Sequence, residues 1–500
     1  MTRMPVLEPA VPTTDDLVLA IDQGTSMTKV VAFDLAGRPV ATVERDTPVR
    51  YPAPERAEAD PEEWWRVVAA SIRQVTAADG TGPDRIRAVG LCGLMHTLVA
   101  VDDEGRALHP ALLWPDQRCA AQVEDLAVHA ETVARITGRP LTTMSSLPRL
   151  RWLRDHAPEV LDRAGCYLPV KDFLRLRLTG EIATDPHDAA GTGLIDIASG
   201  AWSAELLALL GIAPGRMPPI RACDEIAGTV SREAASSTGL RRGTPVVVGT
   251  SDWFSTLIGS GCFLPRSTCF YLGSAGILGS FASADELDRL GETRYFGSVT
   301  STGTALRWVR DLLYADEGGA AITYGRLCTE GERSRPGARG LLFLPHMMGE
   351  RGGVMRPNAR GALFGLTLAH DRADIVRAVL EGTAMWLRAT AEPYIDGQPI
   401  GDLVALGGGS QSRLWRQICA ATFDRPLVVP AHTQCSALGA AMLAAVGTGL
   451  RPHGYRALTQ AWSARAAIEE PDLAMSAFYQ DLYRRFRDLE VALRAFGEAG

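Results

Sequence analysis

Short apolar runs separated by polar turns mark the beginning of the chain. The runs 17–21, 28–33 and 39–43 alternate with turns that contain Gly24 and Gly37, a spacing typical of strands joined as a β-meander. The pattern therefore predicts three consecutive strands, of which the first two enclose a turn rich in Gly, Thr and Ser.

Helical signals follow this predicted meander. Asp60, Pro61 and Glu63 supply an acidic N-cap, a proline at the first helical position and a glutamate at the third, which predicts a helix start. Further strands are expected at 87–91, 98–102 and 244–249, with helices at 147–155 and 171–178. Strands alternating with helices indicate an α/β fold.

The opening pattern starts again after Cys262. An apolar strand at 268–272 runs into a Gly/Ser turn at 273–276 and a second strand at 277–281. This weak internal repeat predicts two similar α/β lobes that face each other across a central cleft. The expected division is an N-terminal lobe over 15–262, a C-terminal lobe over 263–465 and a helical tail packed on the lobes over 466–500. Within the second lobe we expect a helix after Asp371, a strand at 403–406 and a small-residue helix at 436–446.

Composition narrows the class of protein. The 500 residues allow a large core, and 51 Lys and Arg against 58 Asp and Glu give a net charge of -7, so nucleic acid and anionic membranes are poor partners. No run of about 20 apolar residues and no signal peptide are visible, so we expect a cytoplasmic protein. Nine scattered cysteines without a Cys-x-x-Cys pair indicate neither a disulfide framework nor a structural metal site. Lys29 and Lys171 are the only lysines.

The first Gly-containing turn has the side chains of a phosphate-binding hairpin. Gly24 permits close backbone approach, Thr25 and Ser26 offer hydroxyl donors, and Lys29 offers a positive charge. Asp22, at the strand end, is suited to hold Mg²⁺ through water. Taken alone, such a sequence is also compatible with an ordinary turn.

Two further glycine clusters are expected to serve the same phosphate chain. Gly273 and Ser274 repeat the donor-rich turn in the second lobe, whereas Gly408, Gly409 and Ser412 follow a strand and open a helix. Free backbone N–H groups at such a helix start favour anions. The three turns together predict an ATP site.

Asp252 follows the apolar strand 245–251, where a carboxylate projects into a cleft rather than into the core. A carboxylate there is suited to accept the proton of a hydroxyl that attacks a phosphoryl group. The alternative is that Asp252 caps the helix beginning at Trp253. The residues alone leave both interpretations open.

A sugar site is expected at two other segments. Met95 and His96, and the turn that contains Asp116, combine apolar surface with hydrogen-bonding groups, as a polyhydroxylated ligand requires. Trp253 is expected to shape the same pocket. The competing interpretations are a core histidine at His96 and a turn salt bridge between Asp116 and Arg118.

Taken in order, the motifs resemble those of the FGGY carbohydrate kinases, a family of the actin/hexokinase/Hsp70 superfamily, and within it they are most similar to the xylulokinase branch. The segments that carry the resemblance are 21–29, 91–96, 113–118, 168–181 with 188–192, 343–351, 361–366 and 407–417. The resemblance implies two ribonuclease-H-like lobes, ATP and Mg²⁺ between them, and Asp252 as the catalytic carboxylate. Asp252 is also a second candidate ligand for the metal, after Asp22.

The resemblance implies an activity, and its departures bear on the substrate. We expect transfer of phosphate from ATP to a primary hydroxyl of an open-chain sugar, namely D-xylulose or a related ketopentose or polyol. Trp253 stands where xylulokinases usually have Asn, Ser274–Ala275 replaces Thr-Ser, and 352–353 lack the usual proline motif. Gluconate or another sugar acid is the alternative, with Arg118 as a candidate cation.

Non-enzymatic members of the superfamily supply a different class of function. A chaperone-like ATP switch would need a peptide-binding domain after the second lobe, and few residues follow it here. A catalytically silent sugar sensor is disfavoured because Asp22, Lys29 and Asp252 are all retained. The expected partners are the sugar and ATP, and a homodimer stays open.

Overall fold

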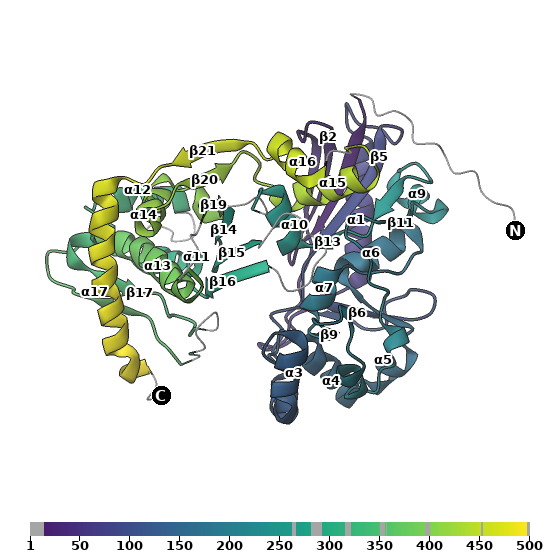
Figure 1. Cartoon of the computed structure of the whole chain (residues 1–500), viewed down its shortest axis with the longest axis horizontal. Coiled ribbons are helices and arrows are strands. Elements are labelled where there is room, and N and C mark those ends of the chain that lie inside the picture. Colours follow the sequence, from purple (N-terminus) through teal and green to yellow (C-terminus); the bar gives the residue numbers. More distant parts are fainter. Residues whose placement is uncertain are drawn as a thin grey trace, which may run out of the picture. The chain divides into compact units, whose positions relative to one another are not determined.

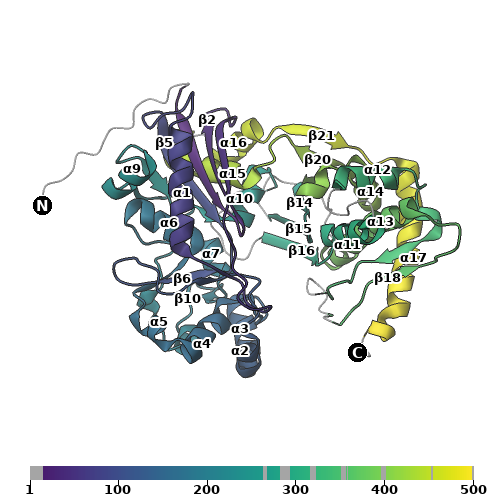
Figure 2. The same ribbon diagram turned by 180° about the vertical axis from the view of Figure 1, so that it is seen from behind.

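The computed structural model describes residues 15–262, 267–281, 293–315, 322–350, 356, 358–395, 401–451 and 454–497, and the chain divides into two compact units (Figures 1 and 2). Of these residues, unit 1 contains 15–259 and 434–462, and unit 2 contains the others. The division differs from the expected lobes at 434–462, which the sequence analysis assigned to the C-terminal lobe and which packs with unit 1.

The main sheet of unit 1 has the strand order β11-β12-β5-β1-β2-β3, with the short β13 also paired to β5. The bounds are β1 Leu17–Gln23, β2 Met27–Asp34, β3 Pro39–Asp46, β5 Ile86–Gly93, β11 Ile226–Thr229, β12 Pro245–Val247 and β13 Thr250–Ser251. β1, β2 and β3 form the predicted antiparallel meander. β5 runs parallel to β1, β12 and β13, so the carboxyl ends of these strands lie at one edge of the sheet.

Unit 2 repeats this topology. Its sheet has the order β16-β15-β14-β19-β20-β21. The bounds are β14 Ser267–Leu272, β15 Gly276–Phe281, β16 Thr293–Val299, β19 Asp402–Leu406, β20 Leu427–Pro430 and β21 Arg465–Glu469. In each unit an antiparallel meander is followed by two parallel neighbours and one antiparallel edge strand. The internal repeat predicted from the two Gly/Ser turns is therefore confirmed as a repeated sheet.

Helices cover the sheet of unit 1. α1 (Pro61–Thr76) begins as predicted, because Asp60 accepts a hydrogen bond from the Glu62 N–H at 2.9 Å. α15 (Cys435–Gly447) packs directly on β1 and β5. A side chain at Gly90 would place its Cβ 2.0 Å from the Ala440 carbonyl oxygen, so the small residues bring helix and sheet close together, as expected for 436–446.

Most of the remaining elements of unit 1 build a helical extension beside the main sheet. Its strand pairs are β4 Glu58–Ala59 with β7 Ala111–Leu112, β6 Leu98–Val101 with β8 Cys166–Pro169, and β9 Ile195–Asp196 with β10 Ala201–Trp202. Its helices are α2 Ala120–Asp125, α3 Ala130–Thr137, α4 Ser146–His156, α5 Pro158–Arg163, α7 Pro186–Gly191 and α8 Ala204–Ala208. The other helices of unit 1 pack on those that cover the main sheet: α6 Val170–Thr179 and α9 Arg232–Thr238 contact α1, and α10 Asp252–Gly259 and α16 Gly454–Trp462 contact α15. A second apolar core, which includes Leu150, Tyr167 and Leu206, stabilises this extension.

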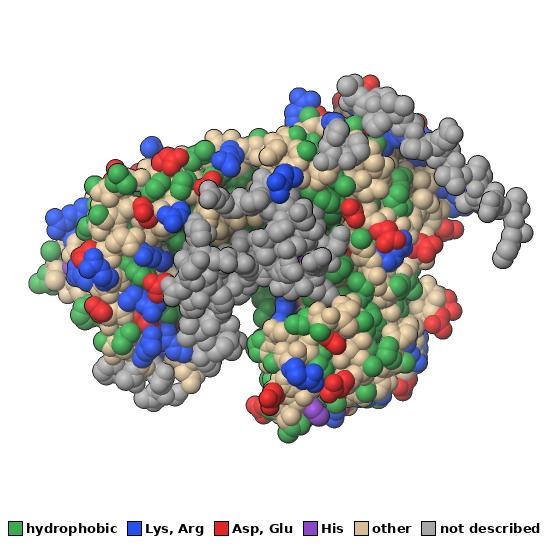
Figure 3. Space-filling view, viewed as in Figure 1, with side chains coloured by type: hydrophobic (Ala, Val, Ile, Leu, Met, Phe, Trp, Pro, Cys, Tyr) green, Lys and Arg blue, Asp and Glu red, His purple; other side chains and the backbone are tan. Residues whose placement is uncertain are grey.

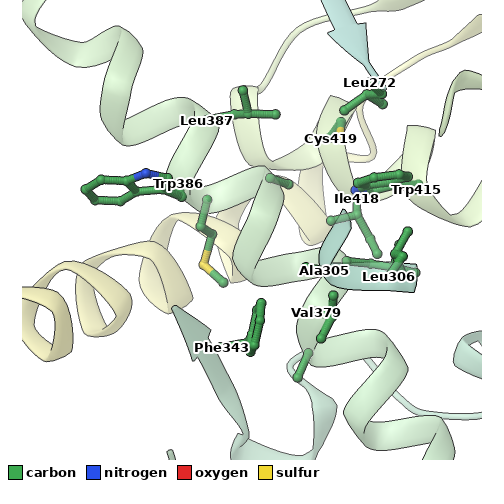
Figure 4. Close-up of a cluster of buried hydrophobic side chains, with 14 of the residues drawn as sticks. Leu272, Ala305, Leu306, Phe343, Val379, Trp386, Leu387, Trp415, Ile418 and Cys419 are labelled. Carbon is green, nitrogen blue, oxygen red and sulfur yellow. The ribbon is translucent and has the colours of Figure 1, made fainter. Parts of the chain in front are cut away.

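The core of unit 2 lies between its sheet and its helices (Figure 4). The helices are α11 Gly303–Leu313, α12 Tyr324–Glu332, α13 Arg372–Ile395, α14 Arg413–Phe423 and α17 Leu473–Gly497, and β17 Leu342–Leu344 pairs with β18 Ala362–Phe364. Trp386 of α13 and Trp415 of α14 are at most 2% exposed within this core. The predicted terminal helix is α17, whose Tyr479 hydroxyl donates to Glu381 of α13 at 2.8 Å.

Charged side chains of both signs lie on the described surface. No helix in the described ranges is long and apolar enough to cross a bilayer. On the face shown in Figure 3, basic and acidic side chains are interspersed over the described surface. All nine cysteines are buried and none forms a disulfide.

Candidate active site

Two carboxylates meet at the edge of the unit 1 sheet where the parallel strands end. Asp22 lies near the end of β1 and is buried. Its Oδ2 accepts a hydrogen bond from the Ser436 hydroxyl at 2.6 Å, and its Oδ1 lies 3.4 Å from the Cys92 thiol, which donates to it. Ser436 comes from α15, so the segment that returns to unit 1 completes this site.

Asp252 is brought to the same edge by a break in its strand. Gly249, between β12 and β13, has φ of 77°, and a Cβ there would lie 2.2 Å from the Leu91 carbonyl oxygen. Only glycine fits this position without distortion. β13 then resumes beside the end of β5, with Thr250 opposite Cys92, and Asp252 opens α10, where its Oδ1 accepts from the Trp253 N–H at 2.7 Å.

The electrostatics of the two carboxylates reflect their proximity. Burial raises the pKa of Asp22 above its ordinary value, although hydrogen bonds and Lys29 oppose the shift. Burial, and after it the negative charge of Asp22, raises the pKa of Asp252 to about 7. The bond from the Trp253 N–H is of the kind that the helix-cap interpretation expects, and the role of Asp252 as a proton acceptor stays a prediction.

The pair fits a hydrated magnesium ion. The charge of Asp22 raises the pKa of Asp252, and a divalent cation between the two carboxylates would offset this repulsion. Mg²⁺ is typically held by one or two carboxylates with water and phosphate oxygens. Among the residues that the structure describes, no group of three or more His, Cys, Asp or Glu could hold a metal.

The raised pKa of Asp252 predicts a pH-dependent stability. The folded chain binds this proton more tightly than the unfolded chain, because the pKa is about 7 in the fold against an ordinary value of 3.8 for a free aspartate. Stability from this group therefore falls as the pH rises from about 4 through about 7. When the pH is raised from 5 to 8 without divalent metal, the unfolding free energy of wild type should fall by about 1–2 kcal/mol relative to that of Asp252→Asn. This range is reduced to allow for the partial exposure of the Asp252 side chain. Urea unfolding of both proteins in EDTA measures this, and parallel pH profiles would contradict it.

The first predicted phosphate turn is formed as a tight hairpin between β1 and β2. The Gly24 N–H donates to the Met27 carbonyl at 2.9 Å, and Ser26 is exposed. The Thr25 hydroxyl accepts from the Trp114 indole N–H at 3.1 Å. Lys29, opposite Asp22 in the β1–β2 register, has its Nζ 3.8 Å from a Glu44 carboxylate oxygen.

The two predicted turns of unit 2 lie side by side at the carboxyl ends of β14 and β19. A Cβ on Gly409 would lie 2.8 Å from the Leu272 Cβ, and one on Gly407 would lie 2.6 Å from the Leu272 carbonyl oxygen. Gly408 has open space around its Cα. The Ser412 hydroxyl caps α14 by accepting from the Trp415 N–H at 3.2 Å. The glycines are thus required by close packing as well as being available to a ligand.

The structure adds the start of α11 to this second-unit cluster. The Gly303 N–H donates to the Gly273 carbonyl at 2.9 Å, and the Thr302 N–H donates to the Ser274 carbonyl at 3.0 Å. The sequence analysis did not select Thr302 or Gly303, since neither belongs to a glycine cluster. Arg351 and the adjacent positions 352–353 of the later motif lie outside the described residues.

The His96 imidazole is neutral, and its surroundings leave one ring nitrogen as a hydrogen-bond acceptor. Its backbone has φ of 61°, its Nδ1 lies 2.6 Å from the Gly191 carbonyl oxygen, and its own carbonyl accepts from Arg149. Burial, and after it the positive charge of Arg139, lowers the pKa of His96 to about 4. Because a carbonyl oxygen only accepts, Nδ1 carries the proton and Nε2 is left with a lone pair.

The other predicted sugar-site residues differ in their surroundings. Met95 packs on α7, since a Cβ at Gly191 would lie 2.9 Å from the Met95 Cε. Trp253 is partly exposed. Asp116 is fully buried, and it accepts from the Arg118 guanidinium at 2.8 Å and from the Ala57 N–H at 2.7 Å. The turn salt bridge weighed in the sequence analysis is therefore present, and a contact of Asp116 with sugar stays a prediction.

Arg118 is fully engaged with acidic side chains. Besides Asp116, it bonds Glu58 at 2.6 Å, and its side chain is 3% exposed. Its charge is therefore neutralised within the fold. This pairing removes the main reason for selecting Arg118 as the partner of an anionic substrate.

The fold is that of an ATP-dependent phosphotransferase of the actin/hexokinase-like class. Each of its two α/β units has parallel strands in its sheet, and the carboxylates and glycine turns lie at the ends of these strands. The chain belongs to the FGGY family of carbohydrate kinases: residues 17–259 match the N-terminal domain and residues 254–448 the C-terminal domain. It is accordingly an ATP-dependent sugar kinase, which decides against the sensor and the chaperone-like switch.

Relatives with two different names resemble the chain over most of its length. A xylulose kinase of Staphylococcus xylosus is 28% identical over 490 residues, covering 94% of this chain and 99% of the relative. A gluconokinase of Bacillus subtilis (strain 168) is 29% identical, covering 86% and 88%. The crystal structure of a xylulose kinase from Rhodospirillum rubrum has a TM-score of 0.86 and 31% identity, with 96% and 99% covered.

Proposed function

We propose that the chain phosphorylates a primary hydroxyl of an open-chain ketopentose or polyol, with D-xylulose as the first candidate. The proposal depends mainly on the position and pKa of Asp252. This carboxylate lies at a strand end beside Asp22, and the pKa of Asp252 is about 7. A base with a pKa near neutral pH is matched to proton transfer under physiological conditions. The resemblance to named xylulose kinases supports the choice of sugar.

In the proposed reaction Asp252 orients the attacking hydroxyl and accepts its proton as the oxygen bonds to the γ-phosphorus of ATP, while the bond from that phosphorus to the bridging oxygen breaks and ADP leaves. The His96 Nε2 lone pair accepts a hydrogen bond from another sugar hydroxyl. Backbone N–H groups and hydroxyls of the first turn in unit 1, and of the glycine turns in unit 2, bind phosphate oxygens. Asp22, with Asp252, would hold Mg²⁺, which supplies neutralisation of phosphate charge when bound.

Gluconate is the second candidate, and one feature of the site favours it. The pKa of His96 is lowered by burial and further by two cations, Arg139 and Arg149. Arg149 is 4% exposed and donates to the carbonyls of His96 and Trp114. Positive charge beside the predicted sugar site would stabilise a carboxylate, and a gluconokinase is among the relatives.

A substrate panel separates the candidates. ADP release is measured with D-xylulose, other ketopentoses, polyols, D-gluconate and no acceptor, at matched ionic strength. The proposal expects kcat/KM for D-xylulose to exceed that for D-gluconate at least tenfold. The reverse order would establish the sugar acid, and equal ADP release with and without every acceptor would contradict phosphorylation of any member of the panel.

Lys29→Ala tests the first phosphate turn. We expect the KM for ATP to rise about tenfold with little change in the KM for sugar, because one charge-assisted phosphate contact is removed. Lys29→Arg, which keeps the charge, is the matched control. Initial rates over an ATP series at saturating sugar measure the effect, and an unchanged KM for ATP would remove Lys29 from nucleotide binding.

A further inference from the structure

A buried ionic cluster lies behind the strand that carries Asp252. Lys171 on α6 has its Nζ 2.6 Å from Asp172, 2.9 Å from Asp185 and 3.2 Å from Asp188, and Arg175 also bonds Asp172. Each of the five residues is at most 3% exposed. The cluster contains one of the only two lysines in the chain, and the proposed reaction does not use it.

The cluster forms hydrogen bonds to the chain on both sides of Gly249, where β12 and β13 are interrupted. The Arg175 guanidinium donates to the Val248 carbonyl at 2.9 Å. On the other side of Gly249, the Thr250 hydroxyl donates to the Asp185 carboxylate at 2.8 Å. Asp185 also accepts from the N–H groups of His187 and Asp188, at 2.9 and 3.3 Å, so its carboxylate is fixed at the start of α7.

The side-chain bonds matter because β13, the strand immediately before Asp252, is very short. β13 consists of Thr250 and Ser251 alone, and Asp252 follows at once. The ladder of β12 to β5 has a single paired position, Val246 with Val89. Because so few backbone pairs hold this segment, the side-chain bond from Thr250 to Asp185 is a main constraint on the position of the backbone that leads into Asp252.

A second contact from the same segment reaches α10 directly. The His187 ring, on α7, stacks on the Phe254 ring with centroids 3.2 Å apart. Phe254 is two positions after Asp252 and is buried. The α7 start therefore fixes the backbone on both flanks of Asp252, through Thr250 before it and Phe254 after it.

Stability alone is a poor explanation for this arrangement. Desolvating two cations and three carboxylates costs free energy, and replacing buried ion clusters by apolar groups is often neutral or stabilising. What the buried ion pairs and hydrogen bonds of this cluster do provide is a restricted geometry. That property is valuable next to a group whose placement controls a reaction.

We propose that Asp185, held by Lys171, is a positioning residue that acts through the Thr250 hydroxyl to fix the Asp252 carboxylate for proton acceptance. The proposal rests on the role proposed for Asp252. Asp185 touches neither reactant. Its effect is exerted on the orientation of Asp252, so it should change kcat and leave the affinities for sugar and ATP in place.

Thr250→Val tests this with the smallest change of shape, and Thr250→Ser is its matched control because it keeps the hydroxyl. We expect Thr250→Val to lower kcat about tenfold or more, with both KM values within about twofold of wild type, and Thr250→Ser to stay within about threefold of wild type in kcat. Wild-type kcat in Thr250→Val, or equal impairment of the two variants, would overturn the proposal.

A double-mutant cycle separates this role from a structural one. If Thr250 acts through Asp252, adding Thr250→Val to Asp252→Asn should not lower the residual rate further. An additive loss would overturn the proposal. Should Thr250→Val fail to fold, Asp185→Asn in the same cycle gives the same reading. Normal activity of Asp252→Asn alone would instead contradict the proposed role of Asp252.

Discussion

Asp252→Asn should lower kcat for sugar-dependent ADP release by about 10²–10⁴-fold, the range that a positioned general base supplies. Asn has nearly the same shape but accepts no proton at neutral pH. The hydroxyl must then lose its proton to water as the phosphorus–oxygen bond forms. A coupled ADP assay at saturating sugar and ATP measures the loss, and isothermal titration should give an ATP dissociation constant within about threefold of wild type.

Two comparisons make this result specific. Asp84→Asn, at an exposed position between α1 and β5, removes a carboxylate elsewhere in unit 1 and should leave kcat unchanged. Asp252→Asn should also unfold at higher urea than wild type at pH 8, because the raised pKa marks a destabilised charge. A variant that is inactive and also less stable than wild type at pH 8 would point to damage of the fold, whereas undiminished kcat would exclude Asp252 as the base.

Local patterns were enough to predict much of unit 1. The meander, the start of α1 at Asp60 and the placement of Asp252 after an apolar strand all depend on neighbouring residues, whose periodicity and capping chemistry are visible in the sequence. The second Gly/Ser turn at Gly273 likewise predicted a second lobe similar to the first, and the sheets of the two units have the same strand topology. These features are decided within a few positions along the chain.

Contacts between distant segments could not be predicted in the same way. The hydrogen bond from Ser436 to Asp22 joins residues 414 positions apart, and a small-residue helix does not indicate which sheet it will cover. The packing of 434–462 with unit 1 was therefore not visible in the sequence. Lys171 was noted for its rarity, but nothing in the spacing from Lys171 to Asp185 specifies a buried pair.

The sugar site shows a further reason for ambiguity. The spacing of Asp116 and Arg118 indicated a salt bridge, and the pair is present, but the bond from the Ala57 N–H to Asp116 has no signal in the sequence. The neutral state of His96 likewise depends on burial and on Arg139, which only the fold brings close. The sequence therefore left the roles of Asp116 and His96 open, because both depend on contacts that form only when the chain folds.

Gly439→Ala should cause a large loss of stability, because the added methyl group separates α15 from α10. A Cβ at Gly439 would lie 1.9 Å from the Ser255 carbonyl oxygen, and one at Gly259 would lie 2.0 Å from the Cys435 carbonyl oxygen. Both obstacles are backbone atoms of a facing helix, so no side-chain rotation relieves them. We expect about 3 kcal/mol of lost unfolding free energy, at the upper end for overpacking.

The same substitution should reach the active site, because α15 carries the Ser436 that bonds Asp22 and whose carbonyl accepts from the Ser255 hydroxyl at 2.6 Å. We therefore expect kcat to fall together with stability, as measured by scanning calorimetry and the ADP assay. Gly325→Ala on α12 is the matched control: its Cβ would have only Thr323 Oγ1 within 4 Å, at 3.9 Å, so alanine should stabilise by up to about 1 kcal/mol through helix propensity. Equal stability of Gly439→Ala and wild type would show that the α10–α15 packing does not constrain the site.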